Sequence, residues 1–158
     1  MLLCDEYLAM EAVLLIGIQG SGKSSFYKER FFHTHVRINL DMLKTKHRQQ
    51  LLLRACLEAK QPFVVDNTNV TAQSRALFIT PTKAAGFRVT GYYFRSDVKA
   101  ALLRNSRREG AARVPDKALL GTYKQLEVPS RAEGFDALYY VRTGEAGEFL
   151  IEEWQDEV

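Results

Sequence analysis

Residues 17–24 read Gly-Ile-Gln-Gly-Ser-Gly-Lys-Ser and match the pattern G-x-x-x-x-G-K-[ST] at every fixed position. The segment follows an apolar run at residues 12–16, which is typical of a buried strand, and a helical stretch begins at about residue 22. Its glycines permit positive φ angles and bring backbone N–H groups close to phosphate oxygens. The following helix directs its free N–H groups and its positive dipole end at the same anions. The segment therefore predicts a loop that binds the phosphates of a nucleoside triphosphate.

Two side chains of this loop have predicted roles of their own. Lys23 is expected to place a positive charge against the β- and γ-phosphates, and the Ser24 hydroxyl is expected to bind Mg²⁺. The predicted cofactors are therefore ATP, or another nucleoside triphosphate, and Mg²⁺. The predicted nucleotide-binding residues of the loop are Gly17, Ile18, Gln19, Gly20, Ser21, Gly22, Lys23, Ser24 and Ser25.

The size and composition predict one globular domain that spans residues 1–158. The hydrophobic content is 46%, and 22 Lys and Arg against 19 Asp and Glu give a net charge of only +3. A protein that coats DNA in bulk is usually more basic, so an anionic partner must meet a local patch. Cys4 and Cys56 are expected to be buried free thiols in a reducing cytosol. The first ten residues lack the basic start of a signal peptide and no apolar run approaches ~20 residues, which favours a cytoplasmic location without a membrane span.

Strand-like and helix-like stretches alternate, as in an α/β fold with a parallel sheet. Further strands are predicted at residues 36–40, 63–65, 87–94 and 137–141. Further helices are predicted at residues 41–60, 71–85, 97–108 and 116–126, and the remainder around Trp154 is expected to be a loose tail. The predicted architecture is the P-loop NTPase or kinase fold, with about five strands flanked by helices and a helical lid.

The remaining sequence favours a kinase among the classes of protein that carry this loop. A GTPase normally has the guanine-reading N-K-x-D and a D-x-x-G switch, and neither is found in the sequence. A motor or AAA-type ATPase usually has an apolar strand that ends in Asp-Glu, whereas the equivalent strand here ends in Val65-Asp66-Asn67. No glutamate next to Asp66 is therefore available to activate water.

Three further residues fit phosphoryl transfer. Asp41 directly follows the second predicted strand, and residues just beyond the carboxyl ends of such strands line the ligand crevice. A carboxylate there can orient and deprotonate an attacking hydroxyl, or it can simply cap the next helix. Arg104 and Arg108 are four residues apart and are expected on one face of a lid helix, where they can bind phosphate. The alternative is a solvated charged face paired with nearby carboxylates.

The chain resembles the kinase domain of 5′-hydroxyl polynucleotide kinases, of the bacteriophage type and of animal and bacterial end-healing enzymes. The resemblance runs along nearly the whole chain through GIQGSGKSSF, INLDMLKT, VVDNTNVTAQSR, LLRNSRREGAARVPDKALLGTYKQLEVP and EGFDALYYV. It implies that Asp41 is the general base and that Arg104 and Arg108 are lid arginines which neutralise the transferring phosphoryl group. The family usually has arginine where this chain has Lys44, which keeps the charge but lacks the bidentate fork. The implied acceptor-site residues are Asp41, Lys44, Asn67, Thr68, Asn69 and Arg75; on their sequence alone, the two asparagines and Thr68 also suit a turn and a helix cap.

The sequence-based hypothesis is transfer of the γ-phosphate of ATP to the 5′-hydroxyl end of RNA or DNA in nucleic-acid repair. Two alternatives stay open: a kinase for a small hydroxyl compound, and an ATPase or switch subunit without an acceptor. The chain would be a stand-alone kinase, and the sequence leaves open both a homo-oligomer and a separate 3′-end-processing or ligase partner. Two side-chain groups are read as structural: His33, His35 and His47 share no metal pattern with the cysteines, and Tyr92, Tyr93 and Phe94 are expected in the core.

Overall fold

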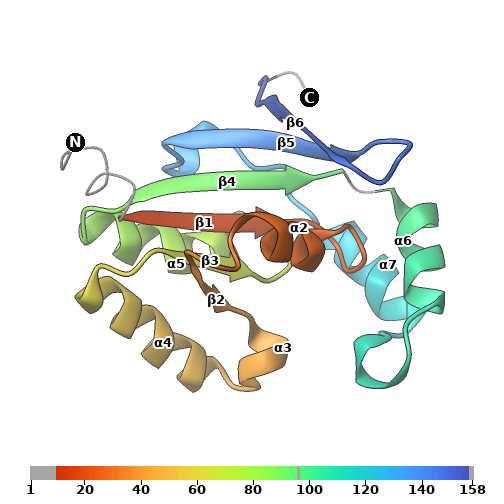
Figure 1. Ribbon diagram of the computed structural model, residues 1–158, viewed down its shortest axis with the longest axis horizontal. Coiled ribbons are helices and arrows are strands. Elements are labelled where there is room, and N and C mark those ends of the chain that lie inside the picture. Colours follow the sequence, from red (N-terminus) through yellow and green to blue (C-terminus); the bar gives the residue numbers. More distant parts are fainter. Residues whose placement is uncertain (1–9, 96, 157–158) are drawn as a thin grey trace.

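The computed structural model describes residues 10–95 and 97–156, which form one six-stranded sheet with flanking helices. The strand order is β2-β3-β1-β4-β5-β6, and the first five of these strands run parallel (Figure 1). The strands are β1 (Glu11–Ile16), β2 (Val36–Ile38), β3 (Phe63–Asp66), β4 (Arg88–Phe94), β5 (Ala137–Thr143) and β6 (Phe149–Glu153). The predicted α/β fold is therefore confirmed, with one strand more than expected.

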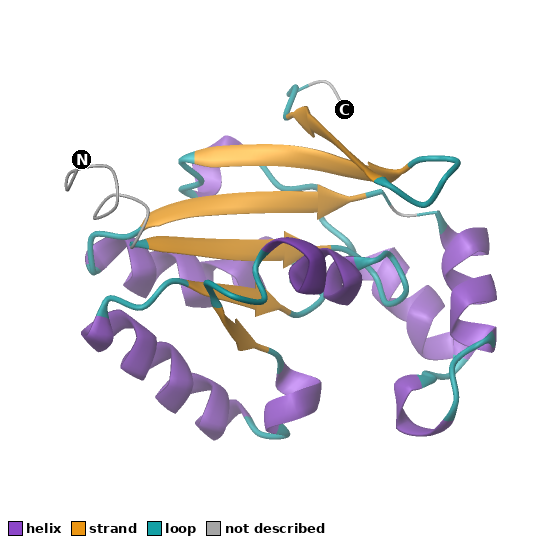
Figure 2. Cartoon of the chain, viewed as in Figure 1, coloured by secondary structure: helices purple, strands orange, loops and turns teal. Residues whose placement is uncertain are grey.

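Helices cover both faces of the sheet, and a further pair lies beyond its carboxyl end (Figure 2). The α-helices are α2 (Lys23–Arg30), α3 (Leu40–Leu43), α4 (Lys46–Ala59), α5 (Ala72–Ala84), α6 (Val98–Ser106) and α7 (Asp116–Gln125). Two 3₁₀ turns, η1 (Gly110–Ala112) and η2 (Arg131–Glu133), lie on either side of α7 in the chain. In Figure 1, α6 and α7 stand beyond the arrowheads of β1 and β4.

The central strand β1 has an apolar side chain on both faces, because each face packs against helices. Leu14 and Ile16 belong to the core cluster with α4 and α5, which includes Leu53 and Phe78. Val13 and Leu15 point to the opposite face and pack with Phe26 and Tyr27 of α2. This arrangement fixes the end of β1, and with it the start of the loop at Gly17.

The sixth strand is the main correction to the fold expected from sequence. β6 pairs antiparallel with β5, with Val141 opposite Ile151 in the register. Trp154, which follows β6, is 4% exposed and meets Tyr93 edge to face at 5.6 Å. Trp154 is therefore docked on the domain. Pairing in a sheet stabilises a segment whose acidic composition suggested a loose tail.

Two predicted helices end or divide at other residues than expected. The long helix predicted at 41–60 is broken at Lys44, where φ is +73°, into the short α3 and the longer α4. Asn39, and not Asp41, caps α3, because its side chain accepts a hydrogen bond from Met42 N. The helix expected to reach residue 108 ends at Ser106, so Arg104 and Arg108 do not share a helix face.

Two helices begin within one residue of their predicted starts, and each has a side-chain cap. Thr71 caps α5 and Asp97 caps α6 through bonds from Ser74 N and Ala100 N. Cys56 is a buried free thiol, whereas Cys4 and the N-terminal segment lie outside the described residues. Within residues 10–95 and 97–156, every helix is too short or too polar to traverse a bilayer.

Candidate nucleotide and acceptor site

The loop between β1 and α2 has the geometry of an anion cradle. Gly20 and Gly22 have φ angles of +79° and +104°, which side chains rarely tolerate. A Cβ atom at Gly17 would lie only 2.8 Å from Ser21 Oγ, so a side chain here would force Ser21 to move. Gly22 is the N-cap of α2 and its helix end has no side-chain cap, which leaves N–H groups of the first turn for a ligand.

Lys23 is folded onto this loop and is almost fully buried. Its ammonium group donates hydrogen bonds to Gly17 O and Ile18 O, both at 2.8 Å, and lies 3.4 Å from Ser21 Oγ. Burial lowers the pKa of Lys23 to about 8, with a smaller contribution in the same direction from Arg108. The carboxylates of Asp66 and Asp41 act against this and raise its pKa. Both Asp41 and Arg108 are therefore close enough to the loop lysine to act on its charge.

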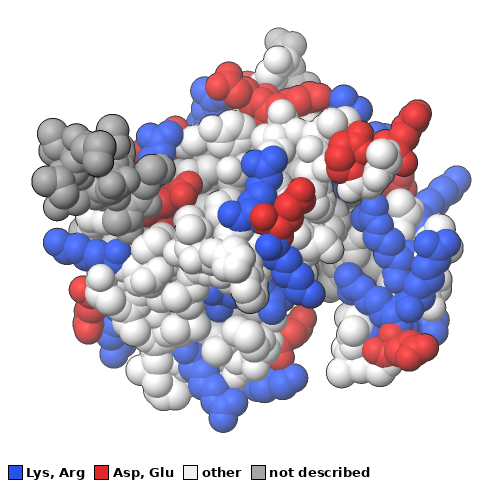
Figure 3. Space-filling view, in the orientation of Figure 1, with Lys and Arg blue, Asp and Glu red and all other residues white. Residues whose placement is uncertain are grey.

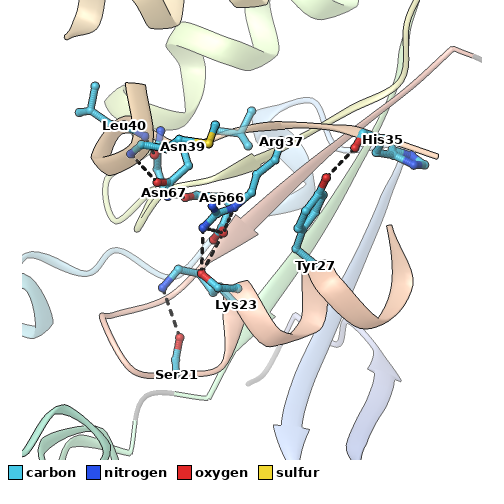
Figure 4. A network of polar contacts seen from close by, with 12 residues as sticks. Ser21, Lys23, Tyr27, His35, Arg37, Asn39, Leu40, Asp66 and Asn67 are labelled. Carbon is cyan, nitrogen blue, oxygen red and sulfur yellow. Dashed lines mark hydrogen bonds and ion pairs between the residues drawn. The ribbon is translucent and has the colours of Figure 1, made fainter. Parts of the chain in front are cut away.

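A second polar group lies on the other side of α2 (Figure 4). Ser24 Oγ donates to Asp66 Oδ2 at 3.0 Å, and Asp66 is 2% exposed at the end of β3. Arg37 of β2 donates from Nε to the same oxygen at 2.8 Å and from Nη2 to Ser24 Oγ at 3.2 Å. Sequence reasoning noted Asp66 only as a strand end, although its place beside the loop strand was a usable signal. Arg37 was missed, because a single arginine in a strand does not indicate a site.

The Ser24–Asp66 pair has the donor atoms that Mg²⁺ prefers. Within the part of the chain that the structure describes, no three His, Cys, Asp or Glu residues gather as a metal cage. Mg²⁺ usually takes one or two protein oxygens and completes its coordination with phosphates and water. The Ser24 hydroxyl and the Asp66 carboxylate are hard oxygen ligands at a nucleotide loop, so these residues fit the predicted ion.

Asp41 is exposed in the first turn of α3, and three asparagine contacts determine where that short helix lies. Asn39 donates to the backbone carbonyl of Asp66, which ties α3 to the end of β3. Asn67 accepts a hydrogen bond from Leu40 N at 2.9 Å and donates to Gln49 Oε1 at 3.0 Å. The predicted acceptor residue Asn67 therefore holds the helix that carries Asp41, and its amide is already engaged on both sides.

Two other predicted substrate contacts are wrong. Asn69 is buried at φ +48° and donates to Leu15 O and Val65 O, so it braces the strand ends. Arg75 has no exposed surface and forms a two-bond ion pair with Glu133, at 2.7 and 3.1 Å. The polar groups of both side chains are buried and bonded to other parts of the fold, so they do not face an acceptor. Thr68 is half-buried, and its carbonyl accepts a bond from Gly17 N at 3.0 Å, which anchors the start of the loop.

The helices α6 and α7, with η1 between them, form the lid. Ile18 of the loop packs in one buried cluster with Ala101 and Leu119 of the lid. Gln19 Nε2 donates to Thr122 Oγ1 at 3.1 Å, so α7 also bonds to the loop. The lid therefore rests directly on the phosphate loop.

The two lid arginines are placed differently. Arg104, in the last turn of α6, donates to Gly20 O at 2.7 Å. Arg108 lies two residues beyond the helix, and among the described residues its side chain makes only one long hydrogen bond, to Ala112 O at 3.4 Å. Arg108 is therefore more free to turn toward a ligand than Arg104.

A cavity of about 220 Å³ opens beside the loop, and an open cleft separates the lid from α3 and α4. Ser21 and Arg104 border the cavity on the loop side. The other lining residues are Arg95, Asp97, Ala100, Val141, Arg142, Thr143 and Gly144. Figure 3 shows the cleft, with Lys and Arg side chains gathered over the lid side of it.

The sequence profile of the family described as AAA domain matches residues 42–129, which is more than half of the chain. The chain belongs to this AAA domain family. The match agrees with the predicted P-loop protein. As expected from the sequence, β3 ends in Asp66-Asn67 without the adjacent glutamate that is usual in a motor or AAA-type ATPase.

The chain is also similar in sequence to a curated protein whose name includes a kinase. It is 28% identical over 132 residues to the bifunctional polynucleotide phosphatase/kinase of Schizosaccharomyces pombe, a match that covers 79% of this chain and 32% of that protein. The chain thus spans about a third of the length of the curated relative.

Solved structures share the fold at low identity. Kti12 of Chaetomium thermophilum, in complex with ADP-AlF3, has a TM-score of 0.64 at 15% identity, over 86% of this chain and 92% of that chain. A fungal RNA kinase has a TM-score of 0.59 at 12% identity, over 94% of this chain and 77% of that chain. A gluconokinase of Sinorhizobium meliloti has a TM-score of 0.56 at 19% identity, over 84% of this chain and 82% of that chain. The architecture is thus an α/β P-loop kinase fold.

Proposed function

We propose that this chain is an ATP-dependent kinase that transfers the γ-phosphate to the 5′-hydroxyl end of RNA or DNA. The observation that carries the proposal is the surroundings of the phosphate loop. Lys23 is folded onto this loop, and Arg104 of the lid donates to Gly20 O at 2.7 Å. Asn39 ties α3, which carries Asp41, to the end of β3 beside the loop. A phosphate-binding lysine, a candidate base and a lid arginine around one loop are the groups that phosphoryl transfer needs.

The donor nucleotide has a binding surface of its own in this proposal. Its phosphates lie on residues 17–25, and the neighbouring cavity takes the base and sugar. Ser24, supported by Asp66, would hold Mg²⁺. The ion supplies positive charge that offsets the charge of the phosphates when it is bound.

The chain's own residues carry the proposed transfer. Asp41 accepts the proton of the 5′-hydroxyl as that oxygen forms a bond to the γ-phosphorus and the bond to the β-phosphate oxygen breaks. Lys23, Arg104 and Arg108 offset the negative charge on the transferring group. Positioning and electrostatics supply most of the acceleration, and the lid excludes water.

A polynucleotide acceptor is supported by the charge on both walls of the cleft and by the relatives. Lys44, at the α3–α4 break, is exposed three residues after Asp41, and the exposed Arg107 and Arg113 extend the lid side. One relative is a polynucleotide phosphatase/kinase and one fold neighbour is an RNA kinase. We also propose that residues 1–158 act as one catalytic domain.

A kinase for a small hydroxyl compound is the second candidate. The gluconokinase shares the fold about as closely as the RNA kinase does, with TM-scores of 0.56 and 0.59. The low net charge of +3 also suits a small substrate.

A labelled-phosphate assay separates these functions. The protein is incubated with γ-labelled ATP, Mg²⁺ and, in parallel, 5′-hydroxyl RNA, 5′-hydroxyl DNA, the same strands with a 5′-phosphate, or gluconate. The proposal expects label on the 5′-hydroxyl strands and none on the 5′-phosphorylated ones. Label on gluconate alone would support the small-molecule kinase. Release of labelled phosphate without transfer to any acceptor would support an ATPase.

A further inference from the structure

The guanidinium of Arg37 lies against both the Ser24 hydroxyl and the Asp66 carboxylate. Its guanidinium contacts a single carboxylate oxygen, Asp66 Oδ2, from both Nε and Nη2, each at 2.8 Å. The same oxygen accepts the hydrogen bond from Ser24 Oγ, and Arg37 Nη2 lies 3.2 Å from that hydroxyl. Both oxygens of the candidate metal site therefore already face a cation that belongs to the protein.

The guanidinium is also held from the side. Its central carbon lies over the Tyr27 ring, 5.8 Å from the ring centre, in the range of a cation–π contact. The Tyr27 hydroxyl in turn donates to His35 O at 2.8 Å, which fixes the ring next to β2 (Figure 4). The position of Arg37 is thus set by an ion pair, a hydroxyl and an aromatic face.

The positive charge of Arg37 balances the negative charge of the buried Asp66. Asp66 is 2% exposed, and a buried carboxylate needs a counter-ion or it becomes costly to the fold. Arg37 supplies that charge in the protein without nucleotide. A divalent cation bound to Ser24 Oγ would meet the guanidinium at short range, where like charges repel strongly. The two cations cannot both use these oxygens.

We propose that Arg37 is a resident counter-ion which competes with Mg²⁺ for Ser24 and Asp66, so that the protein without nucleotide binds Mg²⁺ poorly. Nucleotide phosphates add ligands and negative charge, and this allows the metal to replace Arg37. Mg²⁺ and nucleotide binding are then coupled, and each raises the affinity for the other. The inference rests on the proposed function only in taking Ser24 and Asp66 as the Mg²⁺ site.

The test uses Arg37→Met, which keeps much of the side-chain length and removes the charge. The full chain, free of nucleotide, is titrated with MgCl₂ alone while its thermal unfolding is followed, and Mn²⁺ binding is measured by electron paramagnetic resonance. We expect the wild-type Tm to be unmoved by MgCl₂. The variant should start at a lower Tm, regain stability as MgCl₂ is added, and bind Mn²⁺ at least about tenfold more tightly, as expected when a competing charge is removed.

Arg30→Met is the matched control, since Arg30 also lies over an aromatic ring, that of Phe26 at 5.3 Å, but is not bonded to Ser24 or Asp66. Its response to MgCl₂ should equal that of the wild type. Adding Asp66→Asn to the Arg37→Met variant should abolish the gain in metal affinity. If Arg37→Met does not fold, Arg37→Lys, which keeps one charge without the fork, should show a smaller gain of the same sign.

The inference is overturned if the folded Arg37 variants respond to MgCl₂ and bind Mn²⁺ as the wild type does, or if the wild type without nucleotide already binds Mn²⁺ as tightly as they do. These readouts involve no acceptor. A protein that fails to phosphorylate RNA or DNA could still show the Arg37 competition, so the two failures are distinguishable.

Discussion

The Nη1 atom of Arg104 donates a hydrogen bond to the carbonyl oxygen of Gly20 at 2.7 Å, although the two residues are 84 positions apart in the chain. The backbones of the loop and of α6 also approach closely here, since a Cβ atom at Gly20 would lie 3.1 Å from Ala101 O. The lid helix and the phosphate loop are therefore in direct contact, and Arg104 ends at the loop that is predicted to bind phosphate.

Arg104→Ala should lower kcat for phosphoryl transfer by roughly 10²–10³-fold, the usual effect of losing one preorganised group that stabilises developing charge. Lys99→Ala is the matched control, because Lys99 is an exposed cation on the same helix to which no part of the proposed transfer is assigned. Steady-state kinetics with saturating ATP measure the effect. Equal losses in the two variants would argue against a specific role for Arg104.

Asp41→Asn should reduce transfer by roughly 10²–10⁴-fold, the scale of a positioned general base, and should leave nucleotide affinity nearly unchanged. Single-turnover transfer and calorimetric titration with ADP measure the two quantities. Glu58→Gln, which neutralises an exposed carboxylate on α4, should change neither. Near-normal turnover of Asp41→Asn would remove Asp41 from the base role.

Nucleotide affinity should fall as the pH rises above 8, because burial lowers the pKa of Lys23 to about 8. Bound phosphates favour the charged ammonium and raise the pKa of Lys23 in the complex. Below pH 8 the lysine is charged both with and without ligand, so binding takes up no proton. Above pH 8 the free protein has lost the proton and binding must restore it, which weakens the affinity by up to about tenfold per pH unit.

Calorimetry in buffers of different ionisation enthalpy counts this proton. The expected uptake on ADP binding rises from near zero at pH 6.5 toward one at pH 9. It should be absent in Lys23→Met. A flat affinity across this range in the wild type would contradict the assignment.

Lys44→Gly should stabilise the fold while it weakens acceptor binding. Lys44 has a φ of +73°, a strained region for a residue with a side chain, and glycine should recover about 1 kcal/mol of the strain. Loss of the ammonium should raise the KM for a 5′-hydroxyl oligonucleotide about tenfold, since a charge-assisted contact is removed. Lys60→Gly is the control, because Lys60 also has a positive φ, +55°, but ends α4. It should change the stability to urea without changing the KM.

Arg75→Met should destabilise the protein by about 3 kcal/mol or more, because it leaves Glu133 without its buried partner. The exposed pair Lys83–Asp136, at 2.8 Å, provides the comparison. Lys83→Met should cost at most about 1 kcal/mol. Urea unfolding followed by circular dichroism measures both. If Arg75→Met stayed as stable as Lys83→Met but lost acceptor affinity, the predicted substrate role of Arg75 would be restored.

The phosphate loop and the order of strands and helices could be predicted from sequence because both depend on local patterns. Gly20 and Gly22 are required by backbone angles that only a few residue types adopt, and Thr71 and Asp97 cap helices through bonds to residues three positions ahead. Local rules also identified Asp41 at the carboxyl end of a strand. The break at Lys44 was missed because Lys44 is a good helix former and nothing in its type indicates a positive φ.

The unpredicted parts of the site depend on contacts between distant segments. Asp66 and Arg37 meet across 29 positions, and Arg75 meets Glu133 across 58. A sequence shows the charge of each residue but not which charges become buried together. Arg75 was therefore assigned to the acceptor through a resemblance, whereas burial makes it part of the core. β6 was missed for a similar reason, because its pairing with β5 outweighs its acidic composition.

Phe149, the first residue of β6, lies against the loop that β1 and α2 create, since a Cβ atom at Gly22 would meet its ring at 3.2 Å. Its ring also meets that of Phe26 edge to face at 5.2 Å. On the ribosome, the loop is synthesised well before this aromatic contact, because Phe149 lies far downstream of Gly22 in the chain. A nascent chain therefore lacks the ring that packs against the loop until β6 has been made and has paired with β5.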